Sequence, residues 1–457
     1  MATYLFIIGL LVLSSAAYAA GRRRALAVGA ERRLHSRPVH HGLYVVLWCV
    51  VPAIAVLILG WFFEEWLIGS LLVATADPAV VDQFGGRAAF MENVSQLVKS
   101  GLVSQATEPR LREAALHYAS LREIGQAGLF VFVLGVALGG LAWGRRALSP
   151  SFRARNRVEG FFQGMLVAGS AISILTTIGI VLSMLFEAIR FFQLVTWHEF
   201  LFGLQWSPQT AIRADQVGQS GAFGAVPVFT GTLLITFLAM LVAVPIGIFS
   251  AVYTSEYAPP KVRTTVKPVL EILAGVPTVV YGFFAALTVA PMVRDGGGLL
   301  GLDVASESAL AAGLVMGIMI IPFISSLSDD VINAVPQSLR DGSYAMGATR
   351  SETIRQVILP SALPGIVGAF LLAVSRAIGE TMIVVMAAGL AANLTANPLE
   401  AVTTVTVQIV TLLVGDQEFD SAKTLAAFAL GIVLFVITLC LNVIALRVVE
   451  KYREKYD

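Results

Sequence analysis

Asp341-Gly-Ser-Tyr-Ala-Met-Gly-Ala-Thr-Arg-Ser-Glu-Thr-Ile-Arg-Gln-Val-Ile-Leu-Pro360 is a polar stretch between two apolar segments. Gly347 follows Asp341 by six residues, and Leu359 and Pro360 come twelve and thirteen residues after that glycine. The pattern predicts a short helix, a tight turn at the glycine, and a second amphipathic helix. We expect this segment, at about 336–363, to form a compact knob that can dock on a partner protein.

The composition excludes a soluble globule with a polar surface. Of the 457 residues, 57% are apolar and 13% are charged, and the mean hydropathy is +0.80. Both cysteines, Cys49 and Cys440, lie inside apolar segments, which favours small buried groups over a disulfide. None of the five histidines stands at metal-ligand spacing from a cysteine or carboxylate, so no metal site or cofactor is expected.

Nine apolar segments are long enough to cross about 30 Å of hydrocarbon as helices. Backbone polar groups cannot stay unpaired in lipid, so each segment must be helical. The sequence therefore predicts an all-α integral membrane protein with about nine transmembrane helices. The expected spans are 2–20, 43–63, 127–144, 160–189, 225–251, 268–292, 309–326, 364–390 and 425–446.

The distribution of basic residues predicts the orientation of these spans. Alternate connections, taken with the carboxyl terminus, hold 21 of the 31 Lys and Arg residues. The opposite side holds nine, five of them in the long segment 64–126, which also carries eight carboxylates. The positive-inside rule then places the amino terminus outside and the carboxyl terminus and the 336–363 segment inside.

The first span has two interpretations. Ala-Ala-Tyr-Ala-Ala near residue 20 resembles a signal-peptide cleavage site. A signal peptide needs positive charge before its apolar region, whereas here Arg22, Arg23 and Arg24 follow it. The arrangement favours a retained anchor.

A basic loop at 145–159 divides the chain. Residues 1–157 are expected to form an extension with three spans, and residues 158–457 a core with six. Within the outer segment 64–126, one helical face is expected to hold Leu111, Ala114, Ala115, Tyr118 and Leu121. Nothing in the extension carries recognisable chemistry, so we expect it to serve packing or regulation.

The polar stretch resembles the coupling loop of ABC importer permeases, whose pattern is Glu-Ala-Ala, three residues, Gly, nine residues, then Ile-x-Leu-Pro. Asp-Gly-Ser stands here in place of Glu-Ala-Ala. The resemblance implies six core spans of the type I importer plan and contact with an ATPase. The residues expected to make or shape that contact are Asp341, Gly347, Ala348, Arg350, Glu352, Leu359 and Pro360.

Several core segments resemble the PstC-type permease of bacterial high-affinity phosphate importers. They are Glu199-Phe-Leu-Phe-Gly-Leu-Gln-Trp-Ser-Pro208, Gly224-Ala-Val-Pro, Glu256-Tyr-Ala-Pro-Pro260, Leu273-Ala-Gly-Val-Pro-Thr-Val-Val-Tyr-Gly-Phe-Phe284 and Arg376-Ala-Ile-Gly-Glu-Thr381. The resemblance covers about 158–457. It implies a non-enzymatic permease subunit in the bacterial inner membrane that imports phosphate with a PstA-type permease, two PstB-type ATPases and a periplasmic phosphate-binding protein. No Gly-x-x-x-x-Gly-Lys-[Ser/Thr] nucleotide loop is present.

Arg376 and Glu380 are the candidate passage residues. Both fall in the expected span 364–390, where Glu380 would follow Arg376 by one turn on the same face. Charges at mid-bilayer are costly and usually line a pathway or pair inside the bundle. A guanidinium matches two phosphate oxygens, and the carboxylate would hold it when phosphate is absent. The alternative is an ion pair that only locks helices together; the family motif, in which this pair serves transport, favours a role in the passage.

Pro277 interrupts the expected span 268–292 and should bend it, with Thr278 beside the bend. Broken helices often expose backbone groups to substrate in transporters, so this segment either lines the passage or kinks only for packing. The pairs Gly135-x-x-x-Gly139 and Gly160-x-x-x-Gly164 suit close helix contacts.

Two other functions fit some of these features. A permease of the same plan for phosphonate, sulfate or molybdate would also use an arginine in its passage. An intramembrane enzyme or ion-coupled transporter would need paired catalytic carboxylates, a His-Glu-x-x-His helix or a relay of buried ionisable groups. Only Arg376 and Glu380 lie deep in a span, which favours the ABC permease.

Overall fold

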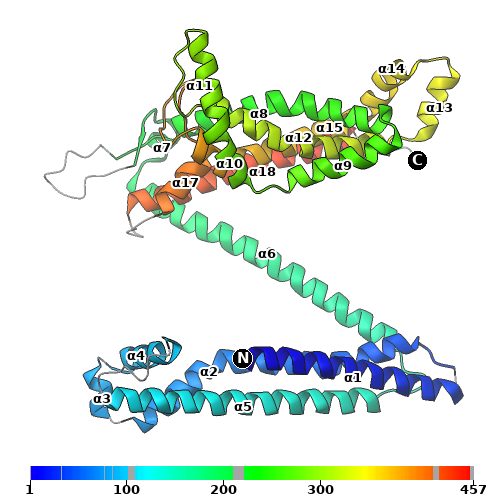
Figure 1. Cartoon of the computed structure of the whole chain (residues 1–457), viewed down its shortest axis with the longest axis vertical. Helices are drawn as coiled ribbons and strands as arrows, with labels where there is room; N and C mark the ends of the chain where they lie inside the picture. Colours follow the sequence, from blue (N-terminus) through cyan, green and yellow to red (C-terminus); the bar gives the residue numbers. More distant parts are fainter. Residues whose placement is uncertain are drawn as a thin grey trace. The chain divides into compact units, whose positions relative to one another are not determined.

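The computed structural model is built almost entirely of helices (Figure 1). Among the residues it describes, eight helices are long and apolar enough to cross a membrane. A ninth crossing results if the bent pair Pro260–Ala274 and Thr278–Leu299 counts as one span. The prediction of an all-α membrane protein with about nine spans is confirmed. The described residues are 2–31, 33–76, 78–84, 86–100, 109–208, 221–414 and 421–452.

The chain folds as two compact units, Met1–Ile174 and Leu175–Asp457. The division falls inside α6 (Ala154–Leu194), and the expected border between 157 and 158 falls near the start of the same helix.

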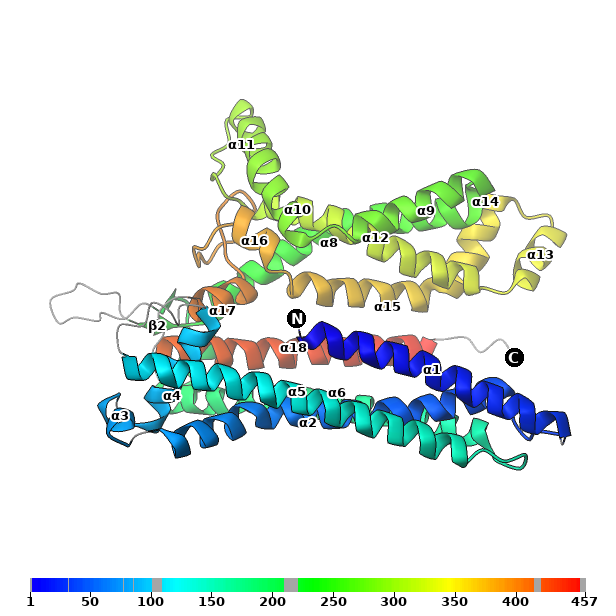
Figure 2. The ribbon, with the colours of Figure 1, turned by 60° about the horizontal axis from the view of Figure 1, so that its bottom comes forward.

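Three long helices make up most of the first unit: α1 (Ala2–Glu31), α2 (Pro38–Thr75) and α5 (Pro109–Arg146). They lie side by side (Figures 1 and 2) around a core that includes Val45, Cys49, Ala53, Val133 and Ala137. All three helices run beyond the apolar spans expected from the sequence, since charged and polar residues at their ends remain helical.

Glycines allow α2 and α5 to approach closely, although not the expected ones. A Cβ at Gly140 would collide with the backbone of Trp48, and one at Gly144 would lie 3.2 Å from the Cα of Val45. Gly135 and Gly139, the expected contact pair, have no atom within 4 Å of such a Cβ, and neither do Gly160 and Gly164. For Gly135 and Gly139 the sequence interpretation is wrong, because Gly140 and Gly144 lie on the side of α5 that packs on α2.

Two short helices, α3 (Pro78–Gln83) and α4 (Arg87–Ser100), pack on the extended ends of α2 and α5. Phe90 and Val94 of α4 are fully buried there against Ala115 and Tyr118 of α5. Leu111, Ala114 and Leu121 are partly buried in the same cluster, so the face predicted from periodicity is confirmed.

The second unit is a bundle centred on α8 (Val226–Val252) and α12 (Ala309–Ala334), which pack along their lengths. Next to them lie α9 (Pro260–Ala274) and α15 (Leu359–Ile378), and α18 (Ala422–Tyr452) packs on α15 (Figures 1 and 2). The shorter helices of this unit are α7 (Trp197–Phe202), α10 (Thr278–Phe284), α11 (Ala290–Leu299), α13 (Gln337–Ala345), α14 (Arg350–Thr353), α16 (Met382–Ala387) and α17 (Val405–Leu413).

A two-stranded hairpin closes one end of this bundle. β1 (Trp206–Ser207) pairs antiparallel with β2 (Ala222–Phe223), and Gly203 and Gly224 touch backbone to backbone, where neither could carry a side chain. The indole of Trp206 donates to Gln408 of α17 at 2.8 Å. The segment beginning at Glu199 therefore has a packing role in this fold.

Among the described residues, three π-helical turns each precede a proline. They are η2 (Tyr253–Tyr257) before Pro259 and Pro260, η3 (Ala285–Val289) before Pro291, and η4 (Ile354–Ile358) before Pro360. Proline cannot donate to the helix ladder and its ring crowds the preceding turn. A wide turn makes room for it, so α14, η4 and α15 remain one continuous helix from Arg350 to Ile378.

Candidate functional site

The helix around Pro277 is broken, not merely kinked. α9 ends at Ala274, α10 starts at Thr278, and the two pieces of the span diverge by 87°. Beyond the break, α10 stays in the bundle against α16 and α12, while α11 projects from it (Figures 1 and 2). The hydroxyl of Tyr281 donates to the Leu273 carbonyl at 2.9 Å and so satisfies an acceptor left open at the end of α9. The predicted interruption is confirmed.

A second break separates Arg376 from Glu380. α15 ends at Ile378, Gly379 follows, and α16 begins at Met382. The carboxylate of Glu380 accepts from the backbone N–H of Met382 at 3.1 Å and thereby starts the new helix. The expectation that Glu380 follows Arg376 by one turn on the same helical face is therefore wrong. The break was hidden because apolar residues continue on both sides of it, in α15 and in α16.

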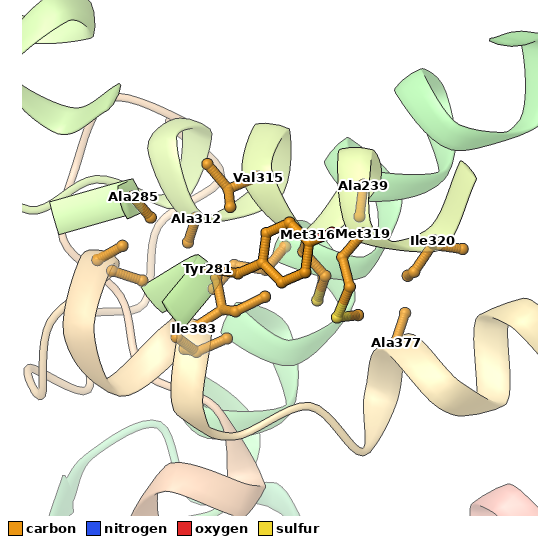
Figure 3. Close-up of a cluster of buried hydrophobic side chains, with 14 of the residues drawn as sticks. Ala239, Tyr281, Ala285, Ala312, Val315, Met316, Met319, Ile320, Ala377 and Ile383 are labelled. Atoms are coloured by element: carbon orange, nitrogen blue, oxygen red, sulfur yellow. The ribbon is translucent and has the colours of Figure 1, made fainter. Parts of the chain in front are cut away.

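The two breaks meet around one apolar core. α10 packs on α16, where a Cβ at Gly282 would lie 2.6 Å from the sulfur of Met386. Figure 3 shows Tyr281 of α10 among Met316 and Met319 of α12, with Ile383 of α16 and Ala377 of α15 nearby. The helices on either side of both breaks therefore pack around this core. The candidate residues at the breaks are Pro277, Thr278, Arg376 and Glu380.

Arg376 lies in the last turn of α15 and is exposed in this chain. Its guanidinium lies 5.7 Å from the centroid of the Phe323 ring of α12, a cation–π contact. Within the described part of the chain it forms no ion pair with Glu380 or any other carboxylate. Among the described residues, the positive charge of Arg376 is therefore not neutralised by a carboxylate.

The coupling segment has the predicted helix, turn and helix. Gly347 adopts φ of +85°, its N–H binds the Tyr344 carbonyl at 2.9 Å, and the N–H of Ala348 binds Ser343 at 3.2 Å. These paired bonds end α13 in a Schellman motif, which favours glycine at this position. The second helix begins with a capping box between Thr349 and Glu352 and continues without interruption into α15.

A buried ion pair fastens α13 to the end of α8. Arg340 donates to the carboxylate of Glu256 at 3.0 Å and to the Ile332 carbonyl at 2.8 Å. The two side chains are only 11% and 9% exposed. Arg350 also donates to the Glu256 carbonyl and lies over the ring of Tyr257 at 5.2 Å. We call Glu256, Arg340 and Arg350 the latch.

Sequence reasoning missed two members of the latch. Glu256 and Arg340 are 84 residues apart, and no periodicity links them. The only available signal was that Glu256 opens one of the segments resembling PstC-type permeases. Arg350 was expected to contact an ATPase, and here it also binds within the chain.

The remaining coupling residues lie on the outside of this segment. Asp341 is exposed and accepts from Gln337 at 3.0 Å, while Pro360 is exposed and Leu359 is half-buried. Tyr344 of α13 is 42% exposed, and Met346, directly after the end of α13, is 89% exposed. In the regions that the structure describes, no group of three or more His, Cys, Asp or Glu side chains could hold a metal ion.

Two family models match the chain. Residues 7–176 match a family described as "Phosphate ATP-binding cassette transporter", and residues 243–454 match "Binding-protein-dependent transport system inner membrane component". The phosphate transport system permease protein PstC of Xylella fastidiosa is 30% identical over 305 residues, covering 63% of this chain and 90% of that protein. This chain belongs to the PstC-type family of ABC transporter permeases.

Other PstC-type relatives agree. PstC 1 of Mycobacterium tuberculosis is 33% identical over 308 residues, covering 62% of this chain and 90% of its own length. The probable ABC transporter permease protein YqgH of Bacillus subtilis is 35% identical over 240 residues, covering 52% and 74%. As a PstC-type permease, the chain is a multi-pass membrane subunit and not an enzyme, and it works with separate ATPase and binding-protein partners.

Proposed function

We propose that this permease subunit carries inorganic phosphate inward and that Arg376 is its phosphate ligand in the passage. The observation that supports this most directly is the exposed guanidinium at the second break, with no carboxylate partner in the described chain. A guanidinium remains charged at physiological pH and binds two phosphate oxygens at once. The names of the PstC relatives and of the matching family over 7–176 favour phosphate over phosphonate, sulfate or molybdate.

Uptake of labelled phosphate by cells lacking every other phosphate importer tests this function. We expect uptake to require a functional ATPase partner and to resist competition by excess sulfate, molybdate or phosphonate. Competition by one of these anions as strong as by unlabelled phosphate would reassign the substrate. Uptake without the ATPase would indicate an ion-coupled transporter.

For the rest of the passage we propose that Thr278 and the backbone around Pro277 line it opposite Arg376, with Glu380 at its edge. Pro277 is exposed and Thr278 and Glu380 are half-buried, so all three can be reached from outside this chain. Glu380 would act mainly by starting α16, through its bond to Met382, and thereby fix where α15 ends.

The proposed partners are a PstA-type permease, two PstB-type ATPases and a periplasmic phosphate-binding protein. The exposed surface of α13 and the start of α14 would enter a groove of one ATPase, since Asp341, Tyr344 and Met346 project there without burial in this chain. The latch would then carry movement of α13 to α8. We further propose that 1–157 is an accessory extension and 158–457 the transport core.

A glycine exchange tests the coupling segment. Gly347→Ala places a side chain at φ of +85°, at a cost of about 1–2 kcal/mol in the turn. We expect phosphate-stimulated ATP hydrolysis to fall severalfold. Gly342→Ala is the matched control, because Gly342 is helical and has open space around it, so alanine should stabilise α13 by about 0.5–1 kcal/mol. Equal activity of the two variants would contradict a role for the turn.

We propose the bacterial inner membrane as the location, with a periplasmic amino terminus and a cytoplasmic carboxyl terminus. In a chain with Cys49 and Cys440 replaced by alanine, single cysteines at Ser100 and Ser351 test this orientation. Both positions are exposed. An impermeant thiol reagent should label the cysteine at Ser100 in intact spheroplasts and the one at Ser351 only after permeabilisation. Labelling of both from one side would refute the nine-span topology.

A further inference from the structure

A cavity of about 240 Å³ lies between α9 and α12, toward the end of α12 that leads into α13. Its polar lining includes the cations Arg263 and Lys267 from α9 and Ser325, Ser326 and Asp329 from α12. Phe323, the residue over which Arg376 lies, also forms part of the wall. The cavity therefore shares one side chain with the proposed passage.

Asp329 is the unusual member of this lining. Its side chain is 5% exposed, and Lys267 donates to its Oδ2 at 3.2 Å. Its Oδ1 is buried and has no hydrogen-bond donor, because the nearest cation, Arg263, remains at 3.6 Å. Leaving a buried carboxylate oxygen without a donor is costly. The open acceptor indicates that a hydrogen-bond donor belongs in the cavity.

The other polar groups need acceptors. The hydroxyls of Ser325 and Ser326 take part in no hydrogen bond within the described structure, and the two cations on α9 are each less than half exposed. A ligand suited to this lining must accept several hydrogen bonds from the cations and hydroxyls and donate one to Asp329. Glu271, which is exposed, also lines the cavity, so the two cations of the lining are formally balanced by two carboxylates.

We propose that this cavity is a second oxyanion site that selects hydrogen phosphate. Inorganic phosphate keeps at least one P–OH group at neutral pH, which Asp329 can accept, while its other oxygens accept from Lys267, Arg263 and the serines. Sulfate and the phosphodiester of a lipid headgroup offer no such proton, so the same carboxylate repels them. The inference rests on the proposed phosphate import. It adds a second site at which the transported anion is selected, between Arg376 and the end of α12 that leads into α13.

The position along α12 fits such a step. Asp329 follows Phe323 by six residues, which is about 9 Å along a helix. A phosphate released from Arg376 at Phe323 would meet Lys267 and Arg263 about two turns nearer the coupling end. When no phosphate is bound, the Asp329 carboxylate pairs with Lys267 and lies near Arg263, so the charges of the empty site remain balanced.

Protection of a cysteine from labelling tests the site directly. Leu270 lines the cavity without contributing a polar group, so Leu270→Cys, with Cys49 and Cys440 replaced by alanine, leaves the site chemistry intact. The assembled transporter is labelled in detergent with a small thiol reagent. Inorganic phosphate at roughly ten times its half-maximal concentration should slow labelling by about tenfold. Sulfate at equal ionic strength should not.

Two exchanges of neighbouring carboxylates sharpen the result. Asp329→Asn can donate a hydrogen bond, so sulfate should now also protect the cysteine introduced at Leu270. Asp330→Asn is the control, because Asp330 is 64% exposed and only approaches Lys267 at 3.7 Å, outside the cavity lining. It should leave the preference for phosphate unchanged.

The outcomes separate this inference from the proposed function. Normal phosphate transport without phosphate protection would overturn the site and leave the function standing. Protection by sulfate equal to that by phosphate in the Leu270→Cys chain would overturn the selective role of Asp329. Protection by vesicles of phosphatidylglycerol, but not by free phosphate, would make the cavity a lipid site. Phosphate protection in a complex that transports no phosphate would refute the proposed function instead.

Discussion

Phosphate uptake is expected to fall at least about a hundredfold in Arg376→Gln, because charge-assisted hydrogen bonds contribute about 1.5–3 kcal/mol each and a bidentate ligand loses two. Arg376→Lys keeps the charge and loses the planar fork, so it should retain a small residual uptake. The measurement is labelled phosphate uptake in cells without other phosphate importers, with membrane levels of the permease determined in parallel.

Controls separate a ligand from a structural cation. Arg294→Gln removes an exposed arginine of α11 that pairs only with its neighbour Asp295 among the residues described, and it should transport normally. Glu380→Gln retains an oxygen for the N–H of Met382, so α16 should still form. The double variant Arg376→Gln with Glu380→Gln should assemble and carry no phosphate. Near-normal uptake by that assembled double variant would rule out Arg376 as an essential ligand.

The second large effect is expected at the latch. Arg340→Leu leaves the Glu256 carboxylate without the guanidinium that binds it, in a site where both side chains were about nine-tenths buried, and it removes the bond to the Ile332 carbonyl. Removing one partner of a buried ion pair costs about 3–5 kcal/mol. We expect phosphate-stimulated ATP hydrolysis and uptake to fall at least about tenfold, since α13 is no longer fixed to α8.

Arg355→Leu is the matched control for this experiment. Arg355 is exposed on η4 and has no bond to Glu256 within the described structure, so its loss should leave coupling near the unmodified level. Co-purification of the ATPase shows whether each variant assembles. An Arg340→Leu complex that assembles and retains full stimulation would contradict the latch as the connection between α13 and α8.

Local geometry was predictable wherever backbone chemistry dictates it. The spacing around Gly347 identified a turn because a Schellman motif favours a residue that tolerates positive φ. The interruption at Pro277 followed from the missing N–H and the proline ring. The apolar spans were found because lipid leaves helices as the only way to satisfy the backbone.

The second break was hidden for a related reason. Gly379 is the only helix breaker near it, and the residues of α16 are as apolar as those of α15. Hydropathy cannot distinguish one long membrane helix from a helix followed by a second, short apolar helix. The deciding interaction is the bond from Met382 to the carboxylate of Glu380, a tertiary choice that periodicity does not report.

Contacts distant in sequence were not predictable at all. The bond between Glu256 and Arg340 joins residues 84 positions apart, and that between Lys267 and Asp329 joins residues 62 apart. The glycine contact between α2 and α5 was missed for a subtler reason. Gly139 and Gly140 are neighbours, and only packing decides which of them faces Trp48.

The wide turn η4 has a consequence for the arginine at the far end of its helix. An α-helix advances about 100° per residue, so the one extra residue in a π turn rotates every later side chain by about that angle. Without it, Arg376 would point about 100° away from Phe323. The direction in which Arg376 points from the helix is therefore determined at the opposite end of that helix, immediately after the segment that would contact the ATPase.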